Sequence, residues 1–149
     1  MRYVIASDIH GDVSSLHDLL IRESRADAFL LLGDVCLAKE EINPFVSVLG
    51  NCDLAFRDDY PLRRDIVFPS GHKALLTHHP LPLSSMGELY SRGYRYVFHG
   101  HTHEREDREV AGVRILCPGS LSFPRDGELG SYIVVNADEK GEEILFLKL

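Results

Sequence analysis

Short apolar runs recur along the chain, and polar or glycine-containing segments separate them. Runs of this length, rich in β-branched and aromatic residues, predict strands that are buried on at least one face. The expected strands cover residues 3–6, 28–32, 45–49, 66–68, 74–77, 94–98, 113–116, 132–135 and 144–147, with a further one around 109–110. Ser70-Gly71 separates two of them and predicts a hairpin turn.

Two segments have the periodicity or the end signals of helices instead. Apolar residues recur at the spacing of one helix face between positions 13 and 24, which predicts a helix there. Ser85 followed by Glu88 is the pattern of a capping box, so a second helix is expected at 85–92, closed by Gly93.

Strands and helices alternate over the first two thirds of the chain, and only strands follow. This order predicts an α/β fold, built on two sheets or on one large mixed sheet. Only 15 residues separate Asp34 from Gly50, which leaves room for a short irregular crossover at 35–43 but not for a full helix. With 149 residues and no repeat or linker, the chain is expected to form a single domain, 1–149.

The composition and the net charge exclude several classes of protein. Hydrophobic residues make up 44% of the chain and charged residues 26%, which is typical of globular domains and excludes a disordered or fibrous protein. The formal net charge of −7 argues against nucleic acid as a tight partner, because phosphates attract a positive surface. It does not exclude phosphate chemistry, since bound metal ions can provide positive charge locally.

The expected location is the cytoplasm. No apolar run approaches the roughly 18 residues of a membrane span, so no membrane partner is expected. Asp8 comes too early for a secretory signal peptide. Three cysteines lie far apart without a C-x-x-C pair, which fits a reducing compartment, and Cys36 and Cys117 are interpreted as packing residues.

Acidic or metal-binding side chains follow five of the expected strands. They are Asp8 and His10 after the first strand, Asp34 after the second, Asn51 and Asp53 after the third, His78 and His79 after residues 74–77, and His101 and His103 after residues 94–98. Sites in open α/β sheets form beyond the carboxyl ends of the strands. If these strands are parallel neighbours, all five groups converge on one rim.

The residue types in these groups suit divalent metals. Carboxylates, an amide oxygen and imidazoles are ligands that Mn²⁺, Fe²⁺, Co²⁺, Ni²⁺ or Zn²⁺ accept. Asp8 and His10, two positions apart on an extended segment, point to the same side, and His101 and His103 repeat this spacing. The carboxylate of Asp34 can bridge two ions, and two ions about 3.5–4 Å apart suit in-line displacement at phosphorus.

Taken together, these residues resemble a known family. Asp8-x-His10, Gly33-Asp34, Gly50-Asn51-x-Asp53, His78 and Gly100-His101-x-His103 resemble the signature of the calcineurin-like metallophosphoesterase superfamily. The Gly-Asn-Cys-Asp form of the third block and the segment 118–125 are similar to the small YfcE-like phosphodiesterases. The resemblance extends over residues 2–148.

The resemblance implies a four-layer α/β/β/α sandwich with a binuclear metal site. By position, Asp8, His10, Asp34 and His103 would hold one ion. Asp34, Asn51, His78 and His101 would hold the other. Manganese is the expected metal, with nickel, zinc, iron or cobalt as alternatives. Asp53 would orient its neighbours.

The activity that the resemblance implies is metal-dependent hydrolysis of a small phosphoester, chiefly a phosphodiester, by a hydroxide that bridges the two ions. A phosphomonoesterase or a dinucleoside polyphosphate hydrolase would use the same chemistry. A non-catalytic scaffold, similar to the retromer subunit on this fold, is a third alternative, although such scaffolds have usually lost ligands that this chain retains. The acidic charge is compatible with a monomer or a homodimer.

Two positions depart from the family pattern. Cys52 stands where many relatives have a histidine that stabilises charge or protonates the leaving group, so it is either a weak acid or a steric spacer. The segment Thr77-His78-His79-Pro80 replaces the Thr-His-Gly-His of many relatives. His79 is then a hydrogen-bond donor behind the ligands, a leaving-group acid or an ordinary loop residue. The candidate catalytic residues are Asp34, Asn51, Cys52, Asp53 and His79.

The remaining polar residues have ordinary interpretations. Three histidines are interpreted as structural: His99 in the core, and His17 and His72 at the surface. The run 104–109, in which charges alternate in sign, is interpreted as a solvated face. Ser120 and Arg125 either bind a substrate phosphate or shape their own loop.

Overall fold

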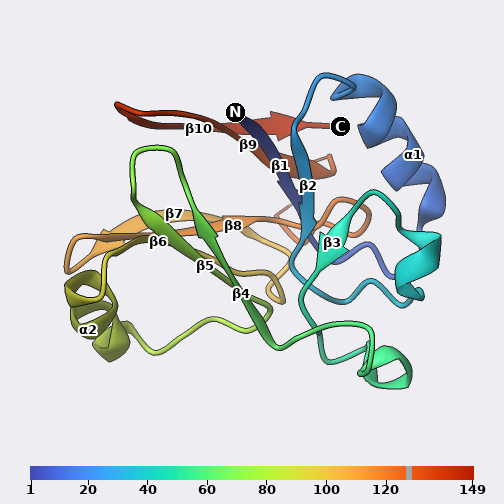
Figure 1. Ribbon diagram of the computed structural model, residues 1–149. Coiled ribbons are helices and arrows are strands. Elements are labelled where there is room, and N and C mark those ends of the chain that lie inside the picture. Colours follow the sequence, from blue (N-terminus) through green and yellow to red (C-terminus); the bar gives the residue numbers. More distant parts are fainter. Residues whose placement is uncertain (127–128) are drawn as a thin grey trace.

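Two five-stranded sheets pack face to face in the computed structural model, which describes residues 1–126 and 129–149 (Figure 1). The first sheet has the order β10–β9–β1–β2–β3, from β1 (Arg2–Ala6), β2 (Ala28–Leu31), β3 (Val46–Ser47), β9 (Ser131–Asp138) and β10 (Gly141–Lys148). The second has the order β4–β5–β6–β8–β7, from β4 (Arg63–Val67), β5 (Lys73–Thr77), β6 (Tyr94–Phe98), β7 (Arg105–Val110) and β8 (Val113–Pro118).

The strands that precede the candidate ligands run parallel to their neighbours. In the first sheet β1 pairs with β2, and β2 with β3, in parallel. In the second sheet β5 pairs with β6 in the same sense. The connections β4–β5, β7–β8 and β9–β10 are antiparallel hairpins, and the turn predicted at Ser70-Gly71 joins the first of these pairs. The carboxyl ends of the ligand-bearing strands are therefore free to meet.

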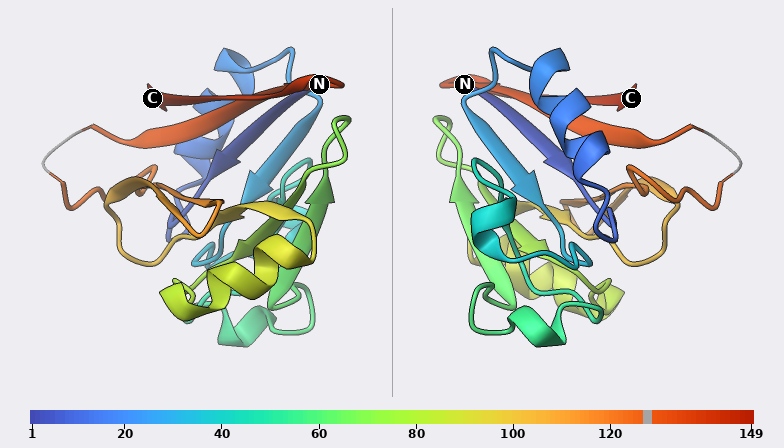
Figure 2. Two further views of the ribbon diagram at one scale, coloured as in Figure 1. Left: turned by 90° about the vertical axis from the view of Figure 1, so that its left-hand side faces the viewer. Right: turned by 90° about the vertical axis from the view of Figure 1, so that its right-hand side faces the viewer.

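The helices α1 (Val13–Arg22) and α2 (Met86–Ser91) lie on opposite outer faces of the pair of sheets (Figure 2). Alternation along β1 shows why, because Tyr3 and Ile5 face the second sheet whereas Val4 and Ala6 pack in the cluster under α1. Leu75 of β5 packs likewise in the cluster under α2. The expected four-layer α/β/β/α sandwich, in a single compact domain, is confirmed.

Side chains of both sheets form the central layer of the core. Its buried members include Ile5, Leu30, Ile133 and Val135 from the first sheet and Ala74, Leu76, Phe98 and Leu116 from the second. Burying one such side chain stabilises the fold by about 1.5–3 kcal/mol. The sheets therefore form a fixed frame, and the loops at their ends carry the polar residues.

The helix ends differ partly from expectation. Asp12 caps α1, because its carboxylate accepts the Ser15 N–H at 3.2 Å. The capping box predicted at Ser85 is wrong, since a 3₁₀ turn (Leu83–Ser85) leads directly into α2 and the Ser85 side chain makes no capping hydrogen bond. Gly93 ends α2 at φ +93°, as predicted.

Several strands have other bounds than the apolar runs suggested, and β9 and β10, for example, extend beyond the predicted runs at both ends. β3 has only two residues, because it meets β2 at just two positions before Leu49 N–H bonds to the Pro61 carbonyl instead. β4 begins at Arg63, and β7 occupies most of the charged run that was interpreted as a solvated face. Both are edge strands, whose outward side chains are charged, so polarity concealed them. The crossover after β2 is short, with one 3₁₀ turn (Lys39–Glu41), as expected.

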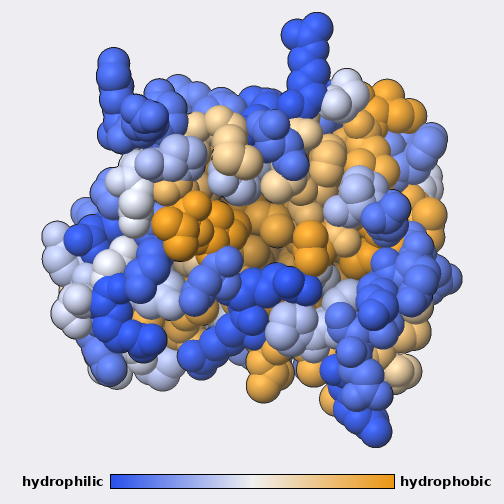
Figure 3. Space-filling view, in the orientation of Figure 1, coloured by the Kyte–Doolittle hydropathy of each residue, from blue (hydrophilic) through white to orange (hydrophobic). Residues whose placement is uncertain are grey.

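The face seen in Figure 3 has apolar surface in its middle and hydrophilic side chains around it. A hollow of about 350 Å³ lies where the two edge strands β3 and β4 approach each other, lined by Leu30, Val46, Pro61, Ile66 and Leu76 among others. Neither α-helix in the described part of the chain has the length and apolar character needed to cross a membrane.

Candidate metal centre

The loops after β1, β2 and β6 come together at one edge of the sandwich. Backbone hydrogen bonds join the first two, from Asp8 N–H to the Gly33 carbonyl (3.2 Å) and from His10 N–H to the Asp34 carbonyl (3.0 Å). Across the sheets, His101 N–H donates to Asp8 Oδ2 at 3.1 Å. Residues that lie far apart in the sequence therefore meet in one place.

The first cluster consists of Asp8, His10, Asp34 and His103, whose ligand atoms all lie within 4.8 Å of one another. His103 Nδ1 donates to the Phe123 carbonyl (2.8 Å), so in the neutral ring Nε2 has a lone pair. That nitrogen lies 3.3 Å from Asp8 Oδ1 and 3.3 Å from His10 Nε2. Asp8 Oδ1 is buried and has no hydrogen-bond partner among the described residues. A cation at this point would satisfy all of these acceptors.

The second cluster consists of Asp34, Asn51, His78 and His101. His78 Nδ1 donates to the Leu32 carbonyl (2.7 Å), which leaves a lone pair on Nε2 of the neutral ring. That nitrogen lies 2.8 Å from Asn51 Oδ1, 3.3 Å from His101 Nδ1 and 3.4 Å from Asp34 Oδ2. Turning the Asn51 amide would direct its NH₂ at these acceptors, whereas keeping its oxygen inward leaves acceptors from four residues facing one another. The second arrangement requires a cation.

Asp34 belongs to both clusters. Its Oδ2 is 3.8 Å from His10 Nε2 in the first and 3.4 Å from His78 Nε2 in the second. Burial alone would raise the pKa of Asp34, but positive charge at His78 and a hydrogen bond from the Cys52 N–H outweigh it and lower the pKa well below the ordinary range. A cation bound at Nε2 of the neutral His78 ring would supply the same positive charge. Asp34 is therefore ionised at neutral pH, and the donor set fits a pair of divalent cations.

The backbone of these loops is strained at the candidate ligands. Asp8, His10, Asp34, Cys36, His101 and His103 all have positive φ, between +44° and +74°. Such left-handed conformations are unfavourable for non-glycine residues and concentrate at functional sites. At Gly33 (φ +90°) a Cβ would lie 2.7 Å from His78 Nδ1, so only glycine permits this approach.

Asp53 is fully buried beside the centre but does not join either cluster. Its Oδ1 accepts the N–H groups of Val35 (2.9 Å) and Cys36 (2.8 Å), and its Oδ2 accepts the Gly50 N–H (2.8 Å). Asp53 thereby ties together the loops after β2 and β3, the position that the predicted orienting role requires.

His79 and Cys52 lie at the exposed border of the centre. A ring nitrogen of His79 is within 4.8 Å of those of His78 and His101. Burial and these two imidazoles lower the pKa of His79, which is therefore neutral at pH 7. Burial and the Asp34 carboxylate raise the pKa of Cys52. Neither side chain is a strong acid at neutral pH.

Cys36 is the residue that the sequence reasoning misplaced. It is predicted to be a packing residue, but it is only partly buried and its Sγ lies 3.9 Å from His10 Nδ1. The signal was its spacing, because Cys36 follows Asp34 by two positions just as His10 follows Asp8. Cys117 is fully buried, which agrees with its interpretation as a packing residue.

The other histidines and the loop residues Ser120 and Arg125 have varied surroundings. His99 is buried, with Nε2 2.6 Å from Glu106 Oε1, and His17 is exposed, as expected. His72 is partly exposed, but it also contacts buried Glu142 (Nδ1 to Oε1, 2.7 Å). The phosphate-binding alternative for Ser120 is wrong, because its hydroxyl is buried and donates to the Asp8 carbonyl at 2.7 Å. Arg125 is exposed, and its N–H donates to the His103 carbonyl at 2.9 Å.

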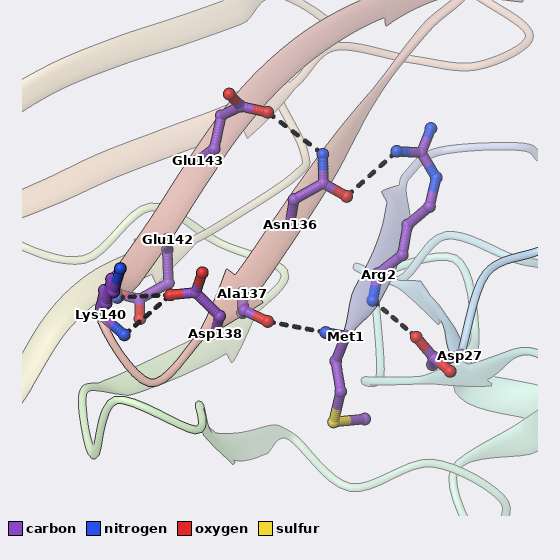
Figure 4. Close-up of a pocket in the computed structure, with 10 residues that line it drawn as sticks. Met1, Arg2, Asp27, Asn136, Ala137, Asp138, Lys140, Glu142 and Glu143 are labelled. Carbon is purple, nitrogen blue, oxygen red and sulfur yellow. Dashed lines mark hydrogen bonds between the residues drawn. The ribbon is translucent and has the colours of Figure 1, made fainter.

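A second polar hollow, of about 600 Å³, lies at the opposite end of β1 (Figure 4). Its polar groups bond to one another, for example Met1 N to the Ala137 carbonyl (2.7 Å), Arg2 N–H to Asp27 Oδ2 (2.7 Å) and the Arg2 guanidinium to Asn136 Oδ1 (3.1 Å). None of these groups belongs to a cluster of metal ligands within the described residues, whereas the clusters around Asp34 lie at the other end of β1.

Comparison with known proteins agrees with this geometry. Residues 1–140 match the model of the calcineurin-like phosphoesterase superfamily domain. A probable metallophosphoesterase of Bacillus subtilis, YsnB, is 26% identical over 98% of this chain and 90% of its own length. A predicted phosphoesterase from Streptococcus pneumoniae superposes with a TM-score of 0.80, at 24% identity, over 99% of this chain and 88% of its own. The E. coli phosphoesterase Yfce superposes with a TM-score of 0.69, at 22% identity, over 91% and 88% of the two chains. The chain belongs to the calcineurin-like phosphoesterase superfamily.

Proposed function

We propose that this chain is a metal-dependent phosphodiesterase with two divalent ions, held by the two clusters that Asp34 joins. The observation that supports this most directly is the convergence of acceptors without donors, above all the buried Asp8 Oδ1, which has no hydrogen-bond partner in residues 1–126 and 129–149. Asp8, His10, Asp34 and His103 would hold one ion, and Asp34, Asn51, His78 and His101 the other. Manganese is the first metal to test, because oxygen and imidazole ligands suit it.

The ions would acidify a water molecule and neutralise charge that develops on the phosphate oxygens. The residues of the chain would hold the metal ligands in fixed positions. Asp53 holds the loops after β2 and β3 in register through three backbone N–H groups. His78 and His103 are each oriented by a backbone carbonyl on Nδ1, so that Nε2 points inward.

The two residues at the exposed border of the site, Cys52 and His79, favour phosphodiesters as substrates. General acid catalysis typically contributes about 10²–10⁴-fold, and it needs a group that can give up a proton near the operating pH. Cys52 holds its proton too tightly for this task, and His79 is already neutral. Substrates with leaving groups that depart unaided, such as aryl phosphodiesters, are therefore favoured over monoesters, which bring more charge and often a poorer leaving group.

The decisive test is Asp34→Asn, which removes the carboxylate shared by both clusters. We expect manganese-dependent turnover of bis-p-nitrophenyl phosphate to fall by at least about 10²-fold, the size of losing a main electrostatic stabiliser. Asp107→Asn is the matched control, because this exposed carboxylate on β7 pairs with Arg114 (2.8 Å) outside both clusters. Near-full activity of Asp34→Asn with unchanged metal content, measured by elemental analysis, would contradict the assignment.

The substrate class is tested by comparing bis-p-nitrophenyl phosphate, p-nitrophenyl phosphate and a dinucleoside polyphosphate at the same manganese concentration. We expect a higher kcat/KM for the diester. A dominant monoesterase rate, or hydrolysis of dinucleoside polyphosphates alone, would replace the diester proposal with one of those activities. Stoichiometric metal binding without hydrolysis of any of these substrates would indicate a scaffold instead.

A further inference from the structure

A third group of ligand atoms lies beside the candidate metal centre, on its solvent side. It consists of His10, Cys36 and Cys52, whose ligand atoms all lie within 4.8 Å of one another. Cys36 is partly buried and Cys52 is exposed. The binuclear assignment uses only one of these residues, His10, and leaves both thiols without a role.

The first three loops of the rim each supply a pair of ligands. One member of each pair is an oxygen donor that faces the two clusters: Asp8, Asp34 and Asn51. The other member, one or two positions later, belongs to the third group: His10, Cys36 and Cys52. The same strand ends thus present three oxygen ligands to the two clusters and two sulfurs on the solvent side, and His10 belongs to both the first cluster and the third group.

The spacing of the third group is close to that of a tetrahedral metal site. With metal–sulfur bonds of about 2.3 Å and metal–nitrogen bonds of about 2.0 Å, a sulfur and a nitrogen on one ion lie about 3.6 Å apart, and two sulfurs about 3.8 Å apart. Cys36 Sγ and His10 Nδ1 are already 3.9 Å apart. Because Cys52 is exposed, its side chain has room to complete the site.

We propose that His10, Cys36 and Cys52 form a third metal site that takes a thiophilic divalent ion such as Zn²⁺ or Cd²⁺. Thiolates select soft or borderline ions, whereas carboxylate and amide oxygens suit Mn²⁺, so the two sites discriminate between metals. The ion replaces the protons of the two thiols, which pass to solvent, and water fills the position left by the three protein ligands.

The site is coupled to the neighbouring cluster through the two nitrogens of one ring. His10 Nδ1 faces Cys36, while Nε2 lies 3.3 Å from His103 Nε2. A neutral imidazole has a single lone pair, so an ion on Nδ1 competes with an ion on Nε2 unless the ring also loses its last proton. A bound thiophilic ion therefore weakens manganese binding in the first cluster; this consequence rests on the ligand set of the proposed function.

The site itself is tested by titrating the metal-free full-length protein with cadmium chloride. We expect the ultraviolet cadmium–thiolate charge-transfer band to saturate at one equivalent. Cys36→Ser and Cys52→Ser should each lower the saturated absorbance by roughly half, because each removes one of two thiolates. Cys117→Ala is the matched control and should keep the full band, since this third thiol is fully buried elsewhere.

A second measurement uses the unmodified chain and does not depend on how the variants fold. Alkylation by iodoacetamide, followed by mass spectrometry, should become at least about tenfold slower at Cys36 and Cys52 when cadmium is bound, because the metal withdraws both thiolates from reaction. The absence of a band in the wild-type protein, a full band in both serine variants, or unprotected alkylation at both positions would overturn the site.

The competition between cadmium and manganese is measured by the rate of manganese-dependent hydrolysis. Cadmium should lower manganese-dependent hydrolysis in the wild-type chain more than in Cys36→Ser, with each protein compared with its own activity without cadmium. Equal inhibition in the two proteins would refute the coupling. Because the absorbance needs no hydrolysis, a chain without phosphodiesterase activity that still gives the band refutes the proposed function and leaves the thiol site standing.

Discussion

The cluster around Asp34 and the cluster around Glu142 both place a histidine beside a buried carboxylate, yet their hydrogen bonding is opposite. Glu142 on β10 has three donors: His72 (2.7 Å), Tyr96 OH (2.8 Å) and the Ser70 hydroxyl. At the other end of the sandwich, lone pairs of imidazoles and carboxylates face one another, and one carboxylate oxygen of Asp8 has no donor in the described part of the chain. The satisfied cluster joins two sheets, whereas the unsatisfied one needs an additional positive charge.

The largest predicted effect is the stabilisation of the folded chain by bound manganese. Manganese at about 100 times its dissociation constant should raise the free energy of unfolding by about 2.7 kcal/mol, because it binds the folded chain alone. Thermal unfolding with and without manganese measures this. Asp8→Asn should lose most of the increase, and Glu142→Gln should keep it. Equal increases in wild type and Asp8→Asn would remove the distinction between the clusters.

The next largest predicted effect is the loss of stability when the hydrogen bonds around Glu142 are weakened. Glu142→Gln should cost about 1–3 kcal/mol at pH 7, since buried donors lose a charged acceptor. Burial alone would raise the pKa of Glu142, but the bonds from Ser70, His72 and Tyr96 lower it. The contribution is therefore complete above the ordinary pKa of a glutamate and is lost as the pH falls through the lower folded-state pKa. Urea unfolding of both proteins from pH 7 to pH 3 should show the difference shrinking; a constant difference would contradict this.

The smallest predicted change in stability concerns Asp12, a carboxylate near the candidate metal centre that already accepts hydrogen bonds. Asp12→Ala should cost about 1 kcal/mol by removing the cap of α1. The hydrogen bond from Ser15 holds the pKa of Asp12 below its ordinary value, so this contribution also disappears in acid. Chemical denaturation measures the loss. If Asp12→Ala abolished the manganese-dependent stabilisation, Asp12 would belong with the ligands rather than with Glu142.

Most of the fold could be predicted because a short continuous apolar run marks a strand that is buried on both faces. Residues 3–6 show this, since adjacent side chains pack in different core layers, as their pattern requires. The failures are at edges. β4 and β7 begin with charged residues, because an edge strand is defined by backbone pairing to one neighbour and not by burial of its own side chains.

The candidate ligands could be predicted because all of them follow strand ends, where parallel pairing brings them together. The outer thiol group could not be assigned by the same reasoning. Cysteine occurs both as a buried core residue and as a metal ligand. The residue type alone therefore does not indicate which of these roles Cys36 has. Its exposure depends on the left-handed turn after β2 (φ +59°) and on the bond from its N–H to Asp53, which are tertiary features.

The left-handed residues at the rim have a consequence for how the protein acquires its ions. An unfolded chain seldom visits those backbone angles, so it cannot offer the same arrangement of donors. The sandwich imposes the arrangement beforehand, and an arriving cation finds its coordination shell already assembled. Affinity then reports on the integrity of the whole scaffold: loosening a distant hydrophobic contact should weaken metal uptake without altering a single coordinating atom.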